Sequence, residues 1–336
     1  MNEQTIQLGH GGGGVLSRDL IQREIVSRFG GGALKGLPDG ATLPVPEGRF
    51  MVFTTDSFVV QPLEFPGGNI GDLAVHGTVN DLAVCGAIPR WLSLALILEE
   101  GLPLATLRRI LDSVKQQADE CGVVVVTGDT KVVERGQCDG MYVNTAGIGE
   151  RMDGFELGAN RVVPGDHILV SGPVGDHGMA VLAAREGIRI THGVKSDTGP
   201  VHRLVQAVRE YAPMIKFMRD PTRGGLAAVL NEVVEDRAMG ILLNESDLPF
   251  STGAKAAAEL LGVDLLQVAS EGRIILIADA TISEPVLKIW KSLPEGRGAT
   301  RIGVVTDAKG RVVLETVTGG RRLVDVPRGE LLPRIC

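Results

Sequence analysis

The sequence is short of positive charge, long apolar runs and closely spaced cysteines, and each shortage excludes a class of protein. Its 336 residues carry 34 lysines and arginines against 41 aspartates and glutamates, so we expect no nucleic-acid partner. No run of about 18 apolar residues occurs, so no membrane association is expected. The first residues lack the basic start and apolar core of a signal peptide, which predicts a cytoplasmic location.

Only four cysteines occur, and none is spaced as C-x-x-C, so neither a zinc site nor a thioredoxin-like motif is predicted. Free thiols in a reducing compartment are the simpler interpretation. Cys85 and Cys121 lie in apolar stretches and are expected in the core, and Cys138 is expected in a loop. Cys336 is the last residue, so we expect an exposed thiol on an extended, mobile tail.

A further absence concerns nucleotides. The P-loop sequence G-x-x-x-x-G-K-[ST] does not occur, so a nucleotide would have to bind in another way. Aromatic residues are also scarce, at 4% of the chain, whereas 45 residues are glycine, nearly twice the usual share of about 7%. These glycines have no G-X-Y period, and they indicate sharp turns or places where backbone approaches a ligand.

Hydrophobic periodicity predicts alternating strands and helices in two domains, which makes the fold class α/β or α+β. We predict a glycine-rich segment with a helix at 1–48, a first domain at 49–155, a second at 156–326 and a tail at 327–336. Helices are expected at 15–29, 70–85, 104–121, 178–186, 199–211 and 226–236, and strands at 5–8, 49–55, 91–99, 123–126, 141–148, 167–170, 240–243, 273–278, 301–305 and 311–314.

A glycine run stands between a short predicted strand and the first predicted helix. It fits G-x-G-x-x-G, but a dinucleotide-binding fold needs a second strand soon after the helix, and residues 30–46 offer none. A glycine loop at a helix start can still bind phosphate, because free N–H groups and the helix dipole favour anions. The candidate residues are His10, Gly11, Gly12 and Gly13, and a flexible N-terminal segment is the alternative.

Three aspartates stand where a bound cation would explain them. Asp56 ends a predicted strand, Asp81 lies in an apolar helical stretch, and Asp220 precedes Pro221 and a helix. A carboxylate in apolar surroundings is costly unless it is paired or binds a cation, and Mg²⁺ takes one or two carboxylates. Taken singly, each could be a cap or turn residue, Asp220 above all. Asp72, His76 and Asn80 share a helical face that we interpret as a solvated polar surface.

The motif Gly128-Asp129-Thr130-Lys131 follows a buried strand. Ligands bind at the carboxyl ends of strands in α/β sheets, so an acid, a hydroxyl and a lysine at this place predict a binding site. A simple Asx turn is the alternative.

Together, several segments resemble the HypE family of hydrogenase maturation factors, the carbamoyl dehydratases. The resemblance runs from about residue 5 to the last residue, and the terminal P-R-I-C together with G-D-T-K-V-V is highly specific. The segments that carry it are F-T-T-D-S-F at 53–58, P-G-G-N-I-G at 66–71, G-T-V-N-D-L-A at 77–83, T-G-D-T-K-V-V at 127–133, N-T-A-G at 144–147, D-P-T-R-G-G at 220–225, E-G at 271–272 and P-R-I-C at 333–336.

The resemblance implies a two-domain fold like aminoimidazole ribonucleotide synthetase (PurM-like), with an N-terminal domain that forms a homodimer. It also implies ATP bound without a P-loop, in a cleft that involves both domains, with Mg²⁺ as a second cofactor. The expected metal ligands are Asp56, Asp81 and Asp220. The expected nucleotide contacts are His10, Gly11, Gly12, Gly13, Asp56, Asn80, Asp81, Gly128, Asp129, Thr130, Lys131 and Asp220.

The reaction that the resemblance implies takes place on Cys336. A carbamoyltransferase, HypF, places a carbamoyl group on the thiol, and ATP activates the carbamoyl oxygen. Loss of phosphate leaves a thiocyanate, whose cyano group goes to iron held by the HypC–HypD complex. We expect Lys131 to stabilise charge on the oxygen or the phosphate. Glu271 is the candidate base for the N–H protons, because a carboxylate at the start of a buried strand can have a raised pKa.

Two other functions fit part of the pattern. Selenophosphate synthetase shares the N-D and D-x-T segments, but it carries a cysteine or selenocysteine just before the glycine loop, where this chain has His10. A non-catalytic scaffold that passes a ligand between partners on its tail would explain Cys336. It would not explain the aspartates or the G-D-T-K motif.

Overall fold

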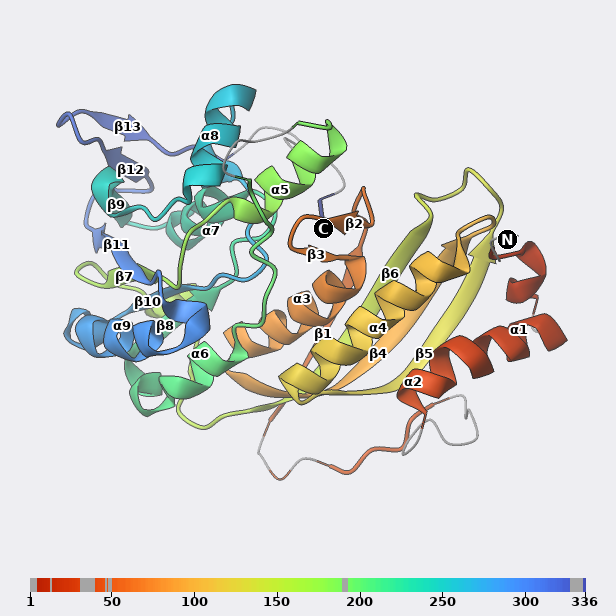
Figure 1. Ribbon diagram of the computed structural model, residues 1–336. Helices are drawn as coiled ribbons and strands as arrows, with labels where there is room; N and C mark the ends of the chain where they lie inside the picture. Colours follow the sequence, from red (N-terminus) through yellow and green to blue (C-terminus); the bar gives the residue numbers. More distant parts are fainter. Residues whose placement is uncertain are drawn as a thin grey trace.

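Two β-sheets organise the chain, one within residues 51–151 and the other within residues 167–323 (Figure 1). The computed structural model describes residues 5–12, 14–30, 40–45, 47, 50–188, 193–326 and 335–336. Within these residues the mixture of strands and helices in two units confirms the predicted fold class.

The first sheet has four strands in the order β1-β6-β4-β5. Two long helices cover one of its faces, where the apolar side chains that point inward from its strands pack against them. The elements are β1 (Met51–Phe58), β4 (Ala87–Glu99), β5 (Val124–Val133), β6 (Met141–Arg151), α3 (Ile70–Val84) and α4 (Leu104–Cys121). A ribbon of β2 (Glu64–Phe65) and β3 (Gly68–Asn69) precedes α3.

The opposite face of this sheet carries no helix among the described residues, although it is partly apolar. Directly opposed residues share a face, and the register aligns Phe53, Ile148, Trp91 and Val124 in one row across the four strands. Phe53 and Val124 are 68% and 57% exposed. An apolar row of this kind marks an interaction surface.

The second sheet has seven strands in the order β13-β12-β9-β11-β7-β10-β8 and is covered on both faces. Its strands are β7 (His167–Val170), β8 (Ile215–Arg219), β9 (Gly240–Asn244), β10 (Ile275–Ala278), β11 (Thr300–Thr306), β12 (Val312–Glu315) and β13 (Arg321–Leu323). One face packs against α7 (Gly225–Val234), and the other packs against α6 (His202–Ala207) and α9 (Ser283–Ser292). A separate apolar cluster joins α5 (Asp176–Arg185) to α8 (Thr252–Leu261).

Helix α3 joins the two halves. Its start is fixed by Asn69, whose side chain accepts hydrogen bonds from the N–H groups of Gly71 and Asp72. The helix contacts β1, β4 and β6 on one side and α6 and β8 of the second half on the other. Nearly all of its residues are therefore buried, and any polar side chain on it faces a protein partner or an enclosed site.

The N-terminal segment lies along β5, at the edge of the first sheet. A short 3₁₀ helix η1 (Leu8–Gly11) contacts β5, and one continuous helical stretch follows as α1 (Val15–Leu20), η2 (Ile21–Val26) and α2 (Ser27–Phe29). The helix predicted at 15–29 is thus confirmed, whereas the strand predicted at 5–8 reduces to a single bridge between Thr5 and Pro103.

Most predicted elements are confirmed, and the differences have physical causes. The strand expected to stop at residue 126 continues to Val133 and carries the G-D-T-K motif inside it, because parallel pairing with β4 extends along its whole length. The helix expected at 199–211 is α6 followed by a 3₁₀ turn that includes Pro213. Among the described residues, the strands β2, β3, β8 and β13 and the helices α8 and α9 were not predicted.

Two predictions about which residues are exposed or buried are wrong. His76 and Asn80 are 4% and 0% exposed, so the helical face that they share is buried between α4 and residues 198–201. Cys85 is exposed where a core position was expected, whereas Cys121 is buried as predicted. A continuous apolar stretch does not reveal which of its residues ends the helix and turns outward.

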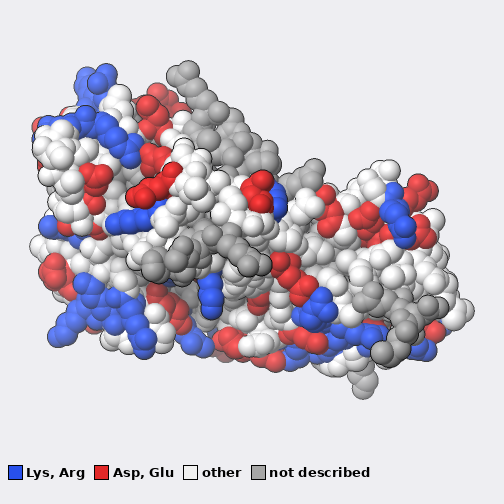
Figure 2. Space-filling view, turned by 45° about the horizontal axis from the view of Figure 1, so that its top comes forward, with Lys and Arg blue, Asp and Glu red and all other residues white. Residues whose placement is uncertain are grey.

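On the face shown in Figure 2, acidic and basic side chains are intermingled over both halves of the molecule. No helix in the described ranges is long and apolar enough to cross a bilayer. The charge pattern on this face indicates no particular ligand, and the candidate site lies in the interior of the molecule.

Candidate active site

Four carboxylates, one arginine and the terminal thiol surround a small cavity where α3 meets the second sheet. The cavity volume is about 30 Å³, which is room for a water molecule or an ion rather than a nucleotide. Its lining comes from both halves of the molecule and from the carboxyl terminus, and consists of Asp56, Gly77, Asp81, Asp220, Thr222, Arg223, Glu271 and Cys336.

Asp56 and Asp81 reach the cavity from β1 and from α3. On β1, Thr54 and Asp56 are two residues apart and therefore point to the same face, toward α3. The Thr54 hydroxyl donates a hydrogen bond of 2.7 Å to Asp81 Oδ2. Burial raises the pKa of both carboxyls, and the negative charge of Asp81 raises the pKa of Asp56 further.

Asp220 follows β8 and is 6% exposed. Burial, and then the negative charge of Asp81, raise its pKa to about 7. Its alternative interpretation as a helix cap is wrong, because α7 starts at Gly225 with Gly224 as its cap. Three buried carboxylates, of which Asp81 raises the pKa of the other two, form a site where a cation would relieve the repulsion.

Glu271 is the most strongly perturbed acid of the site. It is 3% exposed, its Oε1 atom has no hydrogen-bond partner among the described residues, and burial followed by the charge of Asp220 raises its pKa well above the usual value. Its backbone is held on both sides, since its N–H donates to Asp197 Oδ1 at 3.0 Å and its carbonyl accepts from Asn80 Nδ2 at 3.0 Å. The backbone of Glu271 is therefore fixed, although the Oε1 atom of its side chain has no hydrogen-bond partner among the described residues.

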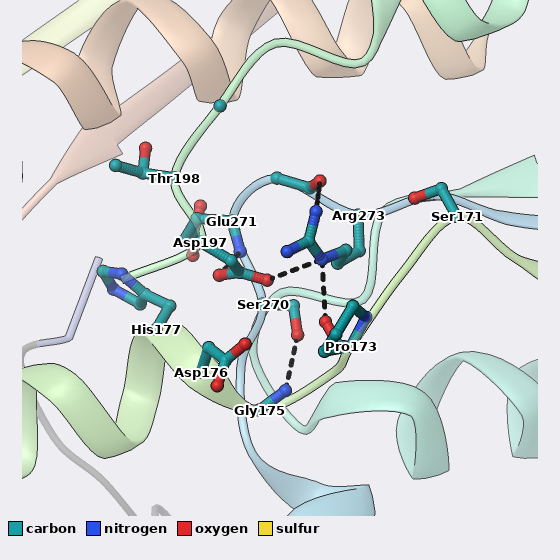
Figure 3. A network of polar contacts seen from close by, with 12 residues as sticks. Ser171, Pro173, Gly175, Asp176, His177, Asp197, Thr198, Ser270, Glu271 and Arg273 are labelled. Carbon is teal, nitrogen blue, oxygen red and sulfur yellow. Dashed lines mark hydrogen bonds and ion pairs between the residues drawn. The ribbon is translucent and has the colours of Figure 1, made fainter. Parts of the chain in front are cut away.

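A buried ion pair between Asp197 and Arg273 lies next to Glu271 (Figure 3). Arg273 Nε lies 3.4 Å from Asp197 Oδ2 and donates to the carbonyl of Pro173 at 2.7 Å. Asp197 therefore has an anchored position from which it accepts the N–H of Glu271. Gly272 stands between Glu271 and Arg273 in the sequence. It has no room for a side chain, because a Cβ there would lie 1.9 Å from the carbonyl oxygen of Asp197.

Cys336 lines the cavity beside Glu271. Burial, and then the charge of Glu271, raise the pKa of the thiol well above its usual range, whereas Arg223 acts in the opposite direction. Ile335 is 5% exposed and pairs with Val60 in a β-bridge. The expectation of an exposed terminal thiol is therefore wrong for this structure, while residues 327–334 of the predicted tail lie outside the described residues.

The three aspartates surround the cavity without forming a closed cage. Among the described residues, no three His, Cys, Asp or Glu side chains are placed to hold one metal ion. Mg²⁺ commonly takes only one or two protein carboxylates and completes its shell with water and phosphate oxygens. The oxygen donors of Asp56, Asp81 and Asp220 therefore fit such an ion when a phosphate-bearing ligand is present.

A second group of predicted residues lies elsewhere in the same chain. Asp129 and Lys131 are exposed on β5 and form an ion pair of 3.0 Å. The register aligns Asp129 with Ala95, Asn144 and Ser57 on the open face of the sheet. Asp56 points to the opposite face and is three strands away, a separation of about 14 Å. This group at the β5 edge also includes Thr130, His10 and Gly11 of η1, and the following Gly12.

Three residues that were predicted to contact the nucleotide make structural contacts within the chain. Asn80 is fully buried and its amide bonds the carbonyls of Gly199 and Glu271 and the N–H of Val201. A Cβ on Gly128 would lie 2.1 Å from a carbonyl oxygen of β4, and one on Gly11 would lie 2.8 Å from the backbone of β5. These contacts explain the residue types without a ligand, and the nucleotide-binding roles stay predictions. Gly13 lies outside the described residues.

Sequence reasoning did not single out Arg223, Thr222 or Asp197. Arg223 and Thr222 stand in the D-P-T-R-G-G segment beside Asp220, so their neighbourhood was a usable signal. Asp197 lies in the unremarkable segment S-D-T-G, and its contact with Glu271 spans 74 residues. No local pattern reveals a contact of that length.

The family models for the N-terminal and C-terminal domains of AIR synthase related proteins match residues 38–151 and 163–315. Carbamoyl dehydratase HypE of Cupriavidus necator is 45% identical over 332 residues, which cover 98% of this chain and 95% of that protein.

Two solved structures are similar over almost the whole chain. A hydrogenase maturation protein HypE in complex with ATP is 41% identical, with a TM-score of 0.94, over 99% of this chain and 100% of that one. The structure of a HypE–HypF complex matches with 41% identity and a TM-score of 0.80, over 92% of this chain and 99% of that one.

Proposed function

The chain belongs to the HypE family of carbamoyl dehydratases, and we propose that it uses ATP to dehydrate a carbamoyl group on Cys336 to a thiocyanate. One observation carries this proposal for the chain itself. The terminal cysteine lines the same small cavity as a buried carboxyl of raised pKa and three aspartates. A thiol seated in this way is placed to present an attached group to a base and to phosphate.

The carbamoyl oxygen of the thiocarbamate on Cys336 attacks the γ-phosphoryl group of ATP, ADP leaves, and one N–H proton is lost. The second N–H proton then leaves, the C–O bond breaks, and phosphate departs with the oxygen. A C≡N triple bond remains on sulfur. Phosphorylation is needed because an amide oxygen is otherwise a poor leaving group, and the products are thiocyanate, ADP and phosphate.

We assign the removal of N–H protons to Glu271. A base works best when its pKa lies near the working pH, and burial has moved the pKa of Glu271 upward from its usual acidic value. Glu271 and Cys336 line the same small cavity, which places the carboxyl next to any group attached to sulfur. Asn80 and Asp197 keep the Glu271 backbone in place.

The aspartates fit a Mg²⁺ ion that neutralises phosphate charge when ATP is bound. Asp56, Asp81 and Asp220 supply its candidate oxygen ligands, and burial, together with repulsion from Asp81 at the other two, raises their pKa values and so favours a neutralising cation. Arg223 is the one cation in the cavity lining, and it is placed to balance charge on the phosphoryl group.

We further propose a homodimer in which the open faces of the two first sheets pack together. The row Phe53–Ile148–Trp91–Val124 supplies an apolar centre for that contact. The dimer also resolves the separation between the two groups of predicted residues. Asp129 and Lys131 of one subunit would meet the acid cluster of the other, so that each ATP site uses both subunits.

The partners follow from the reaction. The carbamoyl group has to come from a carbamoyltransferase, for which we propose a HypF protein, in line with the similar HypE–HypF complex. The cyano group needs an acceptor, for which we propose iron held by a HypC–HypD complex. A reducing compartment, the cytoplasm, keeps the Cys336 thiol free for these transfers.

Phosphate release tests the proposal against its alternatives. The purified chain with ATP, Mg²⁺, carbamoyl phosphate and a HypF protein should release phosphate from ATP, measured as the excess over a HypF-only reaction. The Cys336→Ala variant should lose nearly all of this excess. A non-catalytic scaffold predicts no excess in either protein, and a selenophosphate-synthetase-like enzyme predicts the same excess in both. Either result would refute the proposal.

A further inference from the structure

His177 is a fully buried histidine that contacts the carboxyl terminus. It projects from α5 of the second half (Figure 3), and its Nε2 atom is hydrogen-bonded to the carbonyl oxygen of Ile335. Its Nδ1 atom lies 2.7 Å from Ser196 Oγ, and its ring meets Phe65 of the first half edge-on at 5.4 Å. The ring thus touches both halves of the molecule and the penultimate residue.

The partners of the ring fix its tautomer. A carbonyl oxygen can only accept, so Nε2 carries the hydrogen and donates it to Ile335. The neutral ring then has Nδ1 as an acceptor, which takes the hydroxyl hydrogen of Ser196. Ser196 is itself held, because its N–H donates to Pro66 at 2.7 Å and its Oγ accepts from Thr198 N–H at 3.0 Å. Burial lowers the pKa of His177 to about 4, so the ring is neutral at neutral pH.

The hydrogen bond from His177 holds Ile335, the residue immediately before Cys336. The Ile335 side chain is buried in the core of the first half, its backbone pairs with Val60, and its carbonyl is held by His177. These three contacts restrict the position of Cys336, which lines the cavity beside Glu271. If the terminal pair leaves, Nε2 loses its acceptor in a buried place, which opposes the departure.

We propose that His177 is the positioning residue that seats the carboxyl terminus, through a hydrogen bond from Nε2 to the carbonyl of Ile335. This inference rests on the proposed function, in which the thiol has to receive a carbamoyl group and then return to Glu271. His177 does not touch the reacting atoms. It sets the fraction of molecules in which Cys336 lies in the site.

Alkylation of Cys336 tests this seat without ATP or carbamoyl phosphate, so its result stands even if the proposed reaction fails. A seated thiol is enclosed and has a raised pKa, whereas a released thiol reacts as an ordinary cysteine. Iodoacetamide is added to the full chain at pH 8, and the C-terminal peptide is followed by mass spectrometry, with exposed Cys85 as the internal reference.

Two variants separate the hydrogen bond from the volume of the ring. In His177→Asn the shorter side chain reaches Ser196 but not Ile335, and we expect Cys336 to be alkylated about five to ten times faster. In His177→Gln the amide nitrogen takes the place of Nε2, and we expect a rate within about twofold of the wild type. His202→Gln is the control, because His202 is buried in the same half and makes no described contact with the terminus.

The dehydration rate gives a second readout. With Cys336 already carbamoylated, His177→Asn should lower the single-turnover rate in proportion to the loss of the seated fraction, with unchanged affinity for ATP, and His177→Gln should restore it. The proposal is overturned if His177→Asn is alkylated at the wild-type rate, or if the glutamine variant is alkylated as fast as the asparagine variant. If the asparagine variant does not fold, His177→Leu carries the same expectation.

Discussion

At the scale of single residues, the cost of burying like charges governs the site. Asp220 illustrates it, because it is almost fully buried and shares the cavity with two other aspartates. Its pKa of about 7 in the folded chain exceeds the ordinary value of 3.8. A carboxyl with a raised folded pKa opposes folding increasingly as the pH rises from the lower value to the higher one, and the full penalty is present above about pH 7.

We therefore predict that Asp220→Asn stabilises the chain in the absence of nucleotide. A shift of about three pKa units corresponds to roughly 4 kcal/mol, and relaxation around the site reduces the measurable gain, so we expect about 1–3 kcal/mol at pH 8 and less at pH 5. Urea unfolding at both pH values measures it, with Asp307→Asn at an exposed site as the control. Unchanged or lower stability at pH 8 would contradict this account of the charges.

The same residue shows how far sequence reasoning reaches at this scale. Asp56, Asp81, Asp220, Glu271 and Cys336 were singled out from their local contexts and their resemblance to a family, and the structure brings them to one cavity. Asp197 and His177 were not singled out. Their meaning depends on contacts across 74 and 158 residues, and such contacts exist only after the chain has folded.

At the scale of elements, close packing of α3 on β1 sets the distance between Asp81 and Asp56. Gly77 permits that approach, because a Cβ at this position would lie 2.8 Å from the ring of Phe58 and 3.6 Å from Asp56 Oδ2. Phe58 is 2% exposed, so its ring has little room to move away. An added methyl group would therefore push the helix from the strand.

Gly77→Ala should destabilise the chain by about 1–3 kcal/mol and weaken Mg²⁺-dependent binding of ATP. Urea unfolding and calorimetric titration with ATP measure the two effects. Gly40→Ala is the control, because a Cβ at residue 40 meets nothing within 4 Å. Helix propensity alone favours alanine over glycine by about 1 kcal/mol, so a variant that is more stable than the wild type would show that packing at Gly77 is not limiting.

The elements themselves were predicted best where the pattern is long and regular. The helix at 104–121 matches its predicted bounds, because its apolar residues repeat with helical spacing and Gly122 ends it in a left-handed conformation. The G-D-T-K motif was expected after a strand and lies within β5. Pairing with β4 extends that strand, and a partner strand is not visible in a local pattern.

At the scale of the whole molecule, the separation of Lys131 from Asp81 has a direct consequence. A single chain holds them on opposite faces and opposite edges of one sheet, so the proposed ATP site needs two chains. In a symmetric dimer each site takes its acid cluster from one subunit and its lysine from the other.

Mixing two inactive variants tests this arrangement. Asp81→Asn and Lys131→Ala should each lose dehydration activity, while an equal mixture, unfolded and refolded together, should recover about a quarter of the wild-type rate, because half of the dimers then contain one intact site. A mixture of Asp81→Asn with Asp56→Asn should recover nothing. A Lys131 mixture that stays inactive would show that the two groups do not share a site.

The central claim is that Glu271 acts on a group carried by Cys336, and mass spectrometry of the C-terminal peptide tests it most directly. After incubation with a HypF protein, carbamoyl phosphate and Mg²⁺-ATP, the wild-type peptide should first gain a carbamoyl group and then lose the mass of one water. Glu271→Gln should stop at the carbamoyl stage, while Glu295→Gln, a change at another carboxyl with a buried unpaired oxygen, should not. A Glu271→Gln protein that forms the cyanated peptide at the wild-type rate would contradict the account.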